Sequence, residues 1–126
     1  MSLRTPLGRV RGLGSAKDGV AHWWAQRITA VALIPLLLWL VASLVASAGM
    51  DHAAVKAWLS SPVSATLMIL LIAAGFHHAQ LGLQVVIEDY VHTEWLKIAS
   101  ITAVKLAAVA LAVSGVFSIL KIAFGG

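Results

Sequence analysis

The sequence predicts an all-α membrane protein with three transmembrane helices. Of its 126 residues, 60% are hydrophobic and only 11% are charged, whereas soluble domains carry about 25% charged residues. The mean hydropathy is +0.93. Three apolar segments are each long enough to cross a bilayer as a helix, which takes about 20 residues. We therefore expect lipid rather than water around most of the surface.

The predicted spans are joined by short connections and carry a single formal charge between them. They are residues 28–48, 63–87 and 98–120. Pro35 in the first span is tolerated, because a membrane bundle can satisfy the carbonyl that a proline leaves unpaired. Lys105 in the third span lies close enough to the inner interface for its stem to reach it. With the entry to the first helix, residues 22–126 form one transmembrane domain.

Residues 1–21 form a glycine-rich, basic arm in front of that domain. The first span is too long, and has too many residues before it, for a cleavable signal peptide. Five basic residues precede the span, and only Lys56 lies between the first two spans. Because basic residues collect on the cytoplasmic side of a membrane, we expect the N-terminus in the cytoplasm (or matrix) and the C-terminus outside. We expect the membrane itself to be a bacterial inner membrane. The arm is expected to lie extended on the membrane surface or on a partner protein.

The composition also excludes several kinds of site. The chain has no cysteine, so disulfides, thiolate-bound zinc, iron–sulfur clusters and cysteine nucleophiles are excluded. The net charge of +4 does not indicate nucleic acid, because the basic residues gather beside the first span, where membrane topology explains them. A metal or cofactor must therefore be held by histidine, carboxylate, methionine or backbone groups.

His78 lies in the second span, where an ionisable side chain is expensive and by default functional. Eleven residues separate it from Asp89, which is three helical turns plus about 20°, so both lie on nearly one face. Gly82, one turn from His78, shares this face and leaves room for a large planar group. One interpretation is an axial haem ligand beside a cleared, apolar slot. The alternative is that His78 hydrogen-bonds a neighbouring helix and Gly82 permits close helix packing.

The neighbouring His77 points about 100° away from His78, so the two imidazoles do not address one iron from this helix. We expect His77 to make a structural polar contact with another helix. Gln80 and Gln84 fall on further faces of the span, and we expect the same of them.

Four residues near the inner ends of the spans each have a structural and a functional interpretation. Asp89 and Tyr90 are either ordinary interfacial residues or a quinone site, in which Tyr90 donates a hydrogen bond to a quinone carbonyl beside Asp89. Arg27, which we expect at the depth of Asp89, either sets the topology or pairs with an anion such as a haem propionate. His22 lies just before it, as an interfacial residue or as a second propionate contact.

These residues resemble a motif of a known family, the smaller membrane-anchor subunits of succinate dehydrogenase (respiratory complex II). The recognisable stretch is residues 78–92 (HAQLGLQVVIEDYVH), which has a histidine eleven residues before an Asp-Tyr pair. Residues 19–27 (GVAHWWAQR) resemble the family's entry to its first helix, where an arginine follows a glycine by eight residues. The resemblance covers most of the chain from Gly19 onward, although the third span matches only as an apolar helix. The spacing favours His78 over His77 as the matching histidine.

The resemblance implies half of a heterodimeric helical anchor, whose second cytochrome b subunit supplies the other axial ligand of a shared haem b. It implies His78 as the ligand from this chain, Arg27 and His22 at the haem propionates, and Tyr90 with Asp89 at the site of ubiquinone reduction. On the inner face it implies a flavoprotein and an iron–sulfur subunit, which pass electrons from succinate in the tricarboxylic acid cycle to the respiratory chain. The chain would then be a non-autonomous enzyme subunit without activity of its own.

The residues alone leave other functions open. Within electron transfer, the alternative is an anchor of fumarate reductase or of another quinone-linked cytochrome b. In a different class are a haem-free structural anchor, an assembly factor, and a small proton-coupled transporter that uses His77, His78 and Lys105 as a proton path. A b-type haem spectrum in the purified complex distinguishes the first group from the second.

Overall fold

The computed structural model describes residues 5–12 and 17–125, although not the side chains of 17 and 18, and the described residues form helices and turns without a strand. Five helices follow in chain order: α1 Pro6–Val10, α2 Lys17–Ala46, α3 His52–Ser60, α4 Pro62–Tyr90 and α5 Glu94–Ala123. The three long helices contain segments apolar and long enough to cross a membrane, namely Gly19–Ala46, Pro62–Tyr90 and Glu94–Ala123. The predicted all-α fold with three spans is confirmed.

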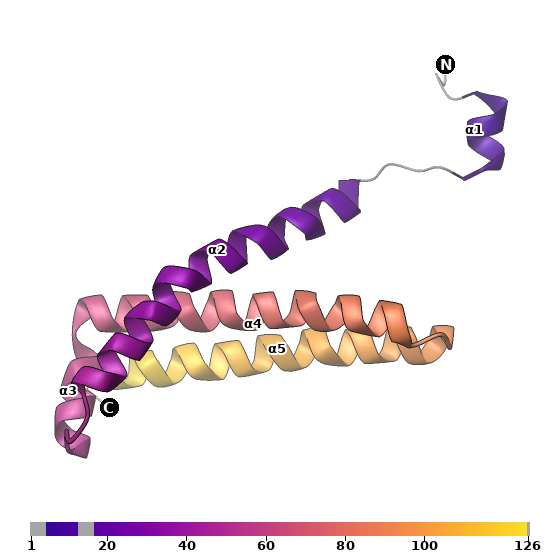
Figure 1. Ribbon diagram of the computed structural model, residues 1–126. Coiled ribbons are helices and arrows are strands. Elements are labelled where there is room, and N and C mark those ends of the chain that lie inside the picture. The colour runs from indigo at the N-terminus through magenta and orange to yellow at the C-terminus, as the bar shows by residue number, and fades with distance from the viewer. Residues whose placement is uncertain (1–4, 13–16, 126) are drawn as a thin grey trace.

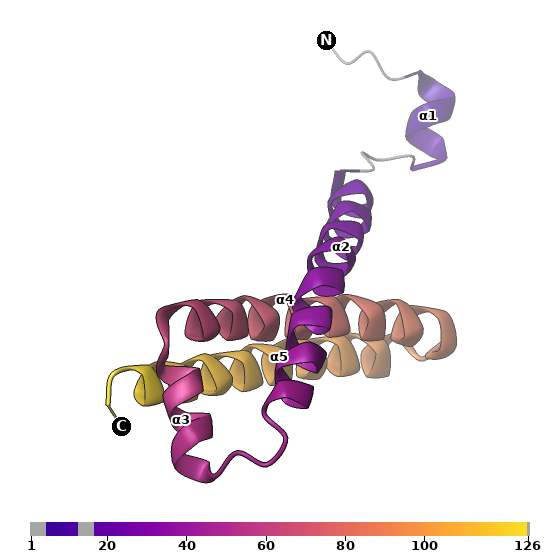
Figure 2. The same cartoon turned by 60° about the vertical axis from the view of Figure 1, so that its left-hand side comes forward.

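The helix α4 lies at the centre of the arrangement. It runs antiparallel to α5 and beside it over nearly the whole length of both helices (Figures 1 and 2). On another face α4 packs against α2, which, among the described residues, makes no helix contact with α5. The N-terminal half of α2 diverges from the α4–α5 pair (Figure 1). On the side of α4 that faces α2, the residues in the middle of α4 therefore contact α2. The residues nearer to the C-terminal end of α4 are not covered by α2.

The connection between α2 and α4 is built from strong local signals. Gly49 has φ +87°, which allows the chain to turn directly after α2. The Asp51 carboxylate then caps α3 by accepting a hydrogen bond of 2.8 Å from the backbone N–H of Ala54. Ser61 ends α3 and caps α4, and Pro62 follows at the first turn of α4, where its missing N–H costs nothing. The helix α3 was not predicted, because hydropathy alone marked this segment as a loop.

The long helices begin before the predicted spans, and α4 and α5 also end after them, whereas α2 ends at Ala46, two residues before the predicted end of its span. The helix α2 begins at Lys17, eleven residues before the predicted start of the span, and continues through Pro35. In the arm we expected an extended chain, but Pro6–Val10 form a short helix capped by the Thr5 hydroxyl, which accepts from Gly8 N at 3.0 Å. The other parts of the predicted arm, residues 1–4 and 13–16, lie outside the described residues.

Very little of the described chain is buried within itself. The buried apolar side chains are few and scattered along the helix contacts: Leu36, Ala65, Leu71, Leu81 and Ile119. Large apolar side chains such as Val45 and Leu106 are instead 73% and 67% exposed. An apolar surface of this extent is stable only against lipid or against another apolar protein surface.

Candidate functional site

A polar pair, Thr29 and His78, lies in the contact between α2 and α4. The Thr29 hydroxyl Oγ1 is 2.9 Å from Nδ1 of the His78 imidazole, and Thr29 itself is buried at 8% exposure. The same hydroxyl lies 2.7 Å from the carbonyl oxygen of Ala25, one turn earlier on α2. Threonine commonly makes this back-bond inside helices. The contact joins residues 49 positions apart in the sequence and links α2 to α4 at Thr29 and His78.

The two nitrogens of His78 have different surroundings. Within the described part of the chain, the contact with Thr29 is the only hydrogen bond of this imidazole. The residue is half-buried, and Nε2 is not among the buried atoms without a partner. Nε2 is therefore accessible from outside the chain, whereas Nδ1 is hydrogen-bonded to Thr29.

Gly82 lies against α2 rather than beside an empty face. A Cβ built on Gly82 would lie 3.8 Å from Nε2 of Gln26, an ordinary van der Waals distance. Within this chain the contact does not require a glycine, since a Cβ would fit beside Gln26. Gly82 is half-buried, and a larger group beside it is compatible with this arrangement.

The second histidine, His77, faces another part of the molecule. With Gln80 it borders grooves between α4 and α5, and His77 is exposed. In the described residues no hydrogen bond involves His77 or Gln80, so the expected polar contacts with another helix are not found within this chain. Gln84 instead donates to the Glu88 carboxylate of the same helix at 3.0 Å. The prediction that the two adjacent imidazoles address different surroundings agrees with this arrangement.

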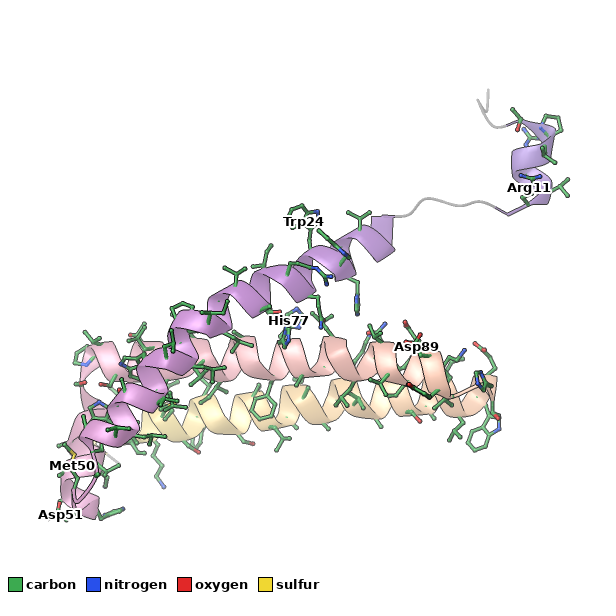
Figure 3. All side chains as sticks on the ribbon, in the orientation of Figure 1. Arg11, Trp24, Met50, Asp51, His77 and Asp89 are labelled. Carbon is green, nitrogen blue, oxygen red and sulfur yellow. The ribbon has the colours of Figure 1, made fainter. Side chains whose placement is uncertain are left out.

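Arg27 does not lie at the depth of Asp89, so that prediction was wrong. Its neighbour Gln26 lies against Gly82, seven residues before Asp89 and therefore about 10 Å away along α4 at 1.5 Å per residue. Figure 3 shows Trp24, from the same turn of α2, above the middle of α4 rather than above its end. The physical reason is that α2 crosses α4 obliquely, so the residues around Thr29 meet α4 between His78 and Gly82 and the chain before them diverges from it.

The guanidinium of Arg27 is exposed and lies over an aromatic ring. Its Cζ is 4.7 Å from the ring centroid of Trp23, a cation–π distance. Two residues before Thr29, Arg27 lies about 200° further round α2 and so points away from α4. His22 lies on the α4 side: its Nε2 and the Oε1 of Gln26 are buried atoms that lack a hydrogen-bond partner among the described residues.

Asp89 and Tyr90 end α4 and are both exposed, Tyr90 to 78%. The chain leaves the helix at Val91 and turns into α5 at Glu94. Figure 3 shows Asp89 at the end of α4 opposite to α3. The structure therefore separates this exposed end from the His78 contact by three helical turns, as predicted.

No group of three or more histidine or carboxylate side chains in the described residues is arranged to hold a bare metal ion. Lys105, the formal charge in the third span, is exposed on α5. Thr29 is the residue that sequence reasoning missed. The sequence shows only a threonine near the start of an apolar helix. This pattern is too common to predict a contact with His78, 49 residues later.

The chain is similar to membrane subunits of succinate dehydrogenase. Residues 1–112 match the family described as succinate dehydrogenase/fumarate reductase transmembrane subunit. A succinate dehydrogenase hydrophobic membrane anchor subunit of Rickettsia bellii is 37% identical over 103 residues, which is 82% of each chain. The protein of that description from Rickettsia conorii is 30% identical over 104 residues, again 82% of each chain. The one from Paracoccus denitrificans is 34% identical over 89 residues, 68% of this chain and 67% of its own.

These matches agree with the three membrane-spanning helices, and they confirm the resemblance drawn from residues 78–92 and 19–27. They also favour an anchor subunit over a small transporter. The chain belongs to the succinate dehydrogenase/fumarate reductase transmembrane subunit family, as a membrane-anchor subunit of succinate dehydrogenase.

Proposed function

We propose that this anchor subunit contributes His78 as one axial ligand of a haem b shared with a second membrane-anchor subunit. The observation that carries the proposal is the surroundings of the imidazole: Nδ1 contacts Thr29 inside the chain, and Nε2 is accessible from outside it. An unpaired polar atom that faces an apolar environment costs free energy. A partner outside the chain, such as an iron, would remove this cost.

The residues present fit such a group. Haem iron is commonly held by a histidine on a rigid helix, and α4 continues without interruption for 29 residues. Because His77 faces α5, it does not supply a second ligand to the same iron, and that ligand would come from the partner anchor. When bound, a haem b supplies a one-electron carrier inside the membrane.

Two residues of α2 would hold the propionates at the edge of the haem. The Arg27 guanidinium is exposed two residues from Thr29, which contacts the proposed ligand, and guanidinium–carboxylate contacts are strong. His22 Nε2 is buried without a partner, and a carboxylate oxygen would satisfy it as an acceptor. Arg27 faces away from α4, so it would reach a propionate only from outside the α2–α4 contact.

Tyr90, with Asp89 beside it, would form part of the site of ubiquinone reduction. Both side chains are exposed at the end of α4, where the head group of a membrane-dissolved quinone and a soluble electron donor can both approach. The phenol O–H of Tyr90 would donate a hydrogen bond to a quinone carbonyl. The Asp89 carboxylate would lie near the group that donates protons to the quinone as it is reduced.

The partners follow from the chemistry that this chain lacks. It has no cysteine for an iron–sulfur cluster, and the electrons from succinate would come from a flavoprotein and an iron–sulfur subunit docked at the inner face. With the proposed cytoplasmic N-terminus in a bacterial inner membrane, Tyr90 would lie on that face.

The test is the reduced-minus-oxidised spectrum of the complex, purified with all the subunits that accompany this chain. We expect a b-type haem band that His78→Ala removes and that the matched control His77→Ala retains. Loss of the band in His77→Ala alone would move the ligand by one residue. A complex without a b-type band in the unaltered protein would support a haem-free anchor instead.

A further inference from the structure

The hydroxyl of Thr29 has three oxygen or nitrogen neighbours but only one proton. Oγ1 lies 2.7 Å from the Ala25 carbonyl oxygen, 3.1 Å from the Gln26 carbonyl oxygen and 2.9 Å from Nδ1 of His78. Carbonyl oxygens only accept hydrogen bonds. At 2.7 Å, the approach of the hydroxyl to the Ala25 oxygen is attractive only if the hydroxyl proton lies between the two oxygens.

This proton count determines the direction of the contact with His78. Since the hydroxyl proton is directed at the α2 carbonyls, Oγ1 has only lone pairs to offer to the imidazole. Nδ1 must then carry the proton and donate it to Oγ1. In a neutral imidazole one nitrogen is the donor and the other the acceptor, so Nε2 of His78 carries a lone pair.

We propose that Thr29 is a positioning residue that fixes His78 in the Nδ1–H tautomer and turns the Nε2 lone pair away from α2. This inference rests on the proposed role of His78 as a haem ligand, and it adds which nitrogen binds and what holds it. The Ala25 carbonyl orients the hydroxyl, the hydroxyl orients the imidazole, and the imidazole presents Nε2 to the iron. Thr29 is suited to this relay because it is buried and its hydroxyl is fixed to its own helix.

The contact also has an electronic consequence. A hydrogen bond from the distal N–H of a ligating imidazole to an oxygen makes the imidazole a more basic ligand. A more basic ligand stabilises ferric over ferrous iron, so the bond to Thr29 lowers the midpoint potential of the haem. The position of α2 on α4 is therefore linked to the potential, because the acceptor belongs to α2 and the ligand to α4.

The experiment uses the complete complex with three substitutions at this position. Thr29→Val keeps the shape of the side chain without the hydroxyl, Thr29→Ala removes the hydroxyl with less bulk, and Thr29→Ser keeps the hydroxyl. The matched control is Thr66→Val, because the Thr66 hydroxyl makes the same back-bond, 2.7 Å to the Pro62 carbonyl, at an exposed position of α4. The measurements are haem content, the midpoint potential by redox titration, and the electron paramagnetic resonance spectrum of the ferric haem.

We expect Thr29→Val and Thr29→Ala to shift the midpoint potential upward and to change the low-spin ferric spectrum, while Thr29→Ser and Thr66→Val remain close to the unaltered complex. Loss of haem in Thr29→Val and Thr29→Ala with retention in Thr29→Ser also supports the inference. An unchanged potential and spectrum in Thr29→Val overturn it, as does haem loss in all three, which would indicate a role in packing. If His78→Ala retains the haem, the proposed ligand itself is wrong; if it loses the haem while Thr29→Val is unchanged, only this inference fails.

Discussion

Gly115 of α5 lies directly against the side chain of Ile72 of α4. A Cβ built on Gly115 would come 3.2 Å from Cγ2 and 3.3 Å from Cδ1 of Ile72, closer than carbon atoms normally approach. Small residues at membrane helix contacts let the backbones come together and gain dispersion energy. The glycine is thus one of the residues that define how closely α4 and α5 pack.

We therefore predict that Gly115→Leu lowers the thermal stability of the anchor, because Ile72 and the two helices must move apart. Overpacking of this kind costs about 1–3 kcal/mol, and the effect of Gly115→Ala should be smaller. The measurement is thermal unfolding of the complex in detergent. The matched control is Gly75→Ala, where a Cβ would lie 4.0 Å from Leu33 Cδ2 and fits without movement. Equal melting temperatures for Gly115→Leu and the control would contradict the prediction.

Hydropathy predicted the number and order of the spans, but it misplaced helix ends and missed α3. Hydropathy measures which residues prefer lipid, whereas a helix can continue through polar residues until a capping signal ends it. The helix α2 therefore includes the polar residues around His22 and begins at Lys17. The nine-residue α3 has signals that hydropathy does not record: the Asp51 cap at its start and the Ser61–Pro62 pair at its end. A search for caps would have found it.

The site was predictable only where it depends on one helix. Helical periodicity gives the shared face of His78 and Gly82 and the separation of His78 from Asp89. It does not give the contact of Thr29 with His78, since that depends on where α2 crosses α4. The same crossing places Gln26 over Gly82 and Arg27 away from Asp89, which no pattern within either helix specifies.

The role of Gly82 can be tested by a substitution that the chain itself tolerates. A Cβ at Gly82 would lie 3.8 Å from Gln26 Nε2, and alanine is the better helix former by about 1 kcal/mol. We predict that Gly82→Ala leaves the melting temperature of the complex unchanged or raised, but lowers its haem content or shifts the haem band. Gly75→Ala, one turn beyond His78 in the other direction, is the control. If the haem content and the haem band do not change, Gly82 does not make room for a haem; a lowered melting temperature with unchanged haem would indicate a packing role instead.

Tyr90→Phe should separate quinone reduction from succinate oxidation. Tyr90 is 78% exposed, so loss of its hydroxyl leaves no buried group unpaired and costs little stability. If the phenol donates to a quinone carbonyl, the succinate–quinone reductase activity of the complex should fall while succinate oxidation with an artificial acceptor persists. The matched control is Tyr90→Trp, which also lacks the phenol but keeps a ring N–H donor, and partial activity is expected. An equal loss of both activities in Tyr90→Phe would indicate an assembly defect rather than a quinone contact.

The stacked rings of Trp39 on α2 and Trp58 on α3, 5.7 Å apart and inclined by 28°, predict how α3 is held. Among the described helices, α3 packs against α4 and α5, whereas its backbone does not come close to that of α2. The stacked rings therefore join α3 to the first span, and aromatic pairs contribute about 0.5–1.5 kcal/mol beyond the area that they bury. Trp58→Ala should therefore loosen α3 and expose the turn at residues 47–51, which limited proteolysis of the complex would report as faster cleavage there. Trp58→Phe should restore part of the protection.

Trp95→Ala is the control for that experiment, since Trp95 is 71% exposed at the opposite end of the helix pair. A double-mutant cycle between Trp39 and Trp58 isolates the stacking term from the loss of either ring alone. If the two substitutions simply add, the rings contribute independently and another contact must hold α3. A coupling energy of about 0.5 kcal/mol or more would show that the tryptophan pair fastens α3 to the first span, and with it the end of the anchor furthest from His78.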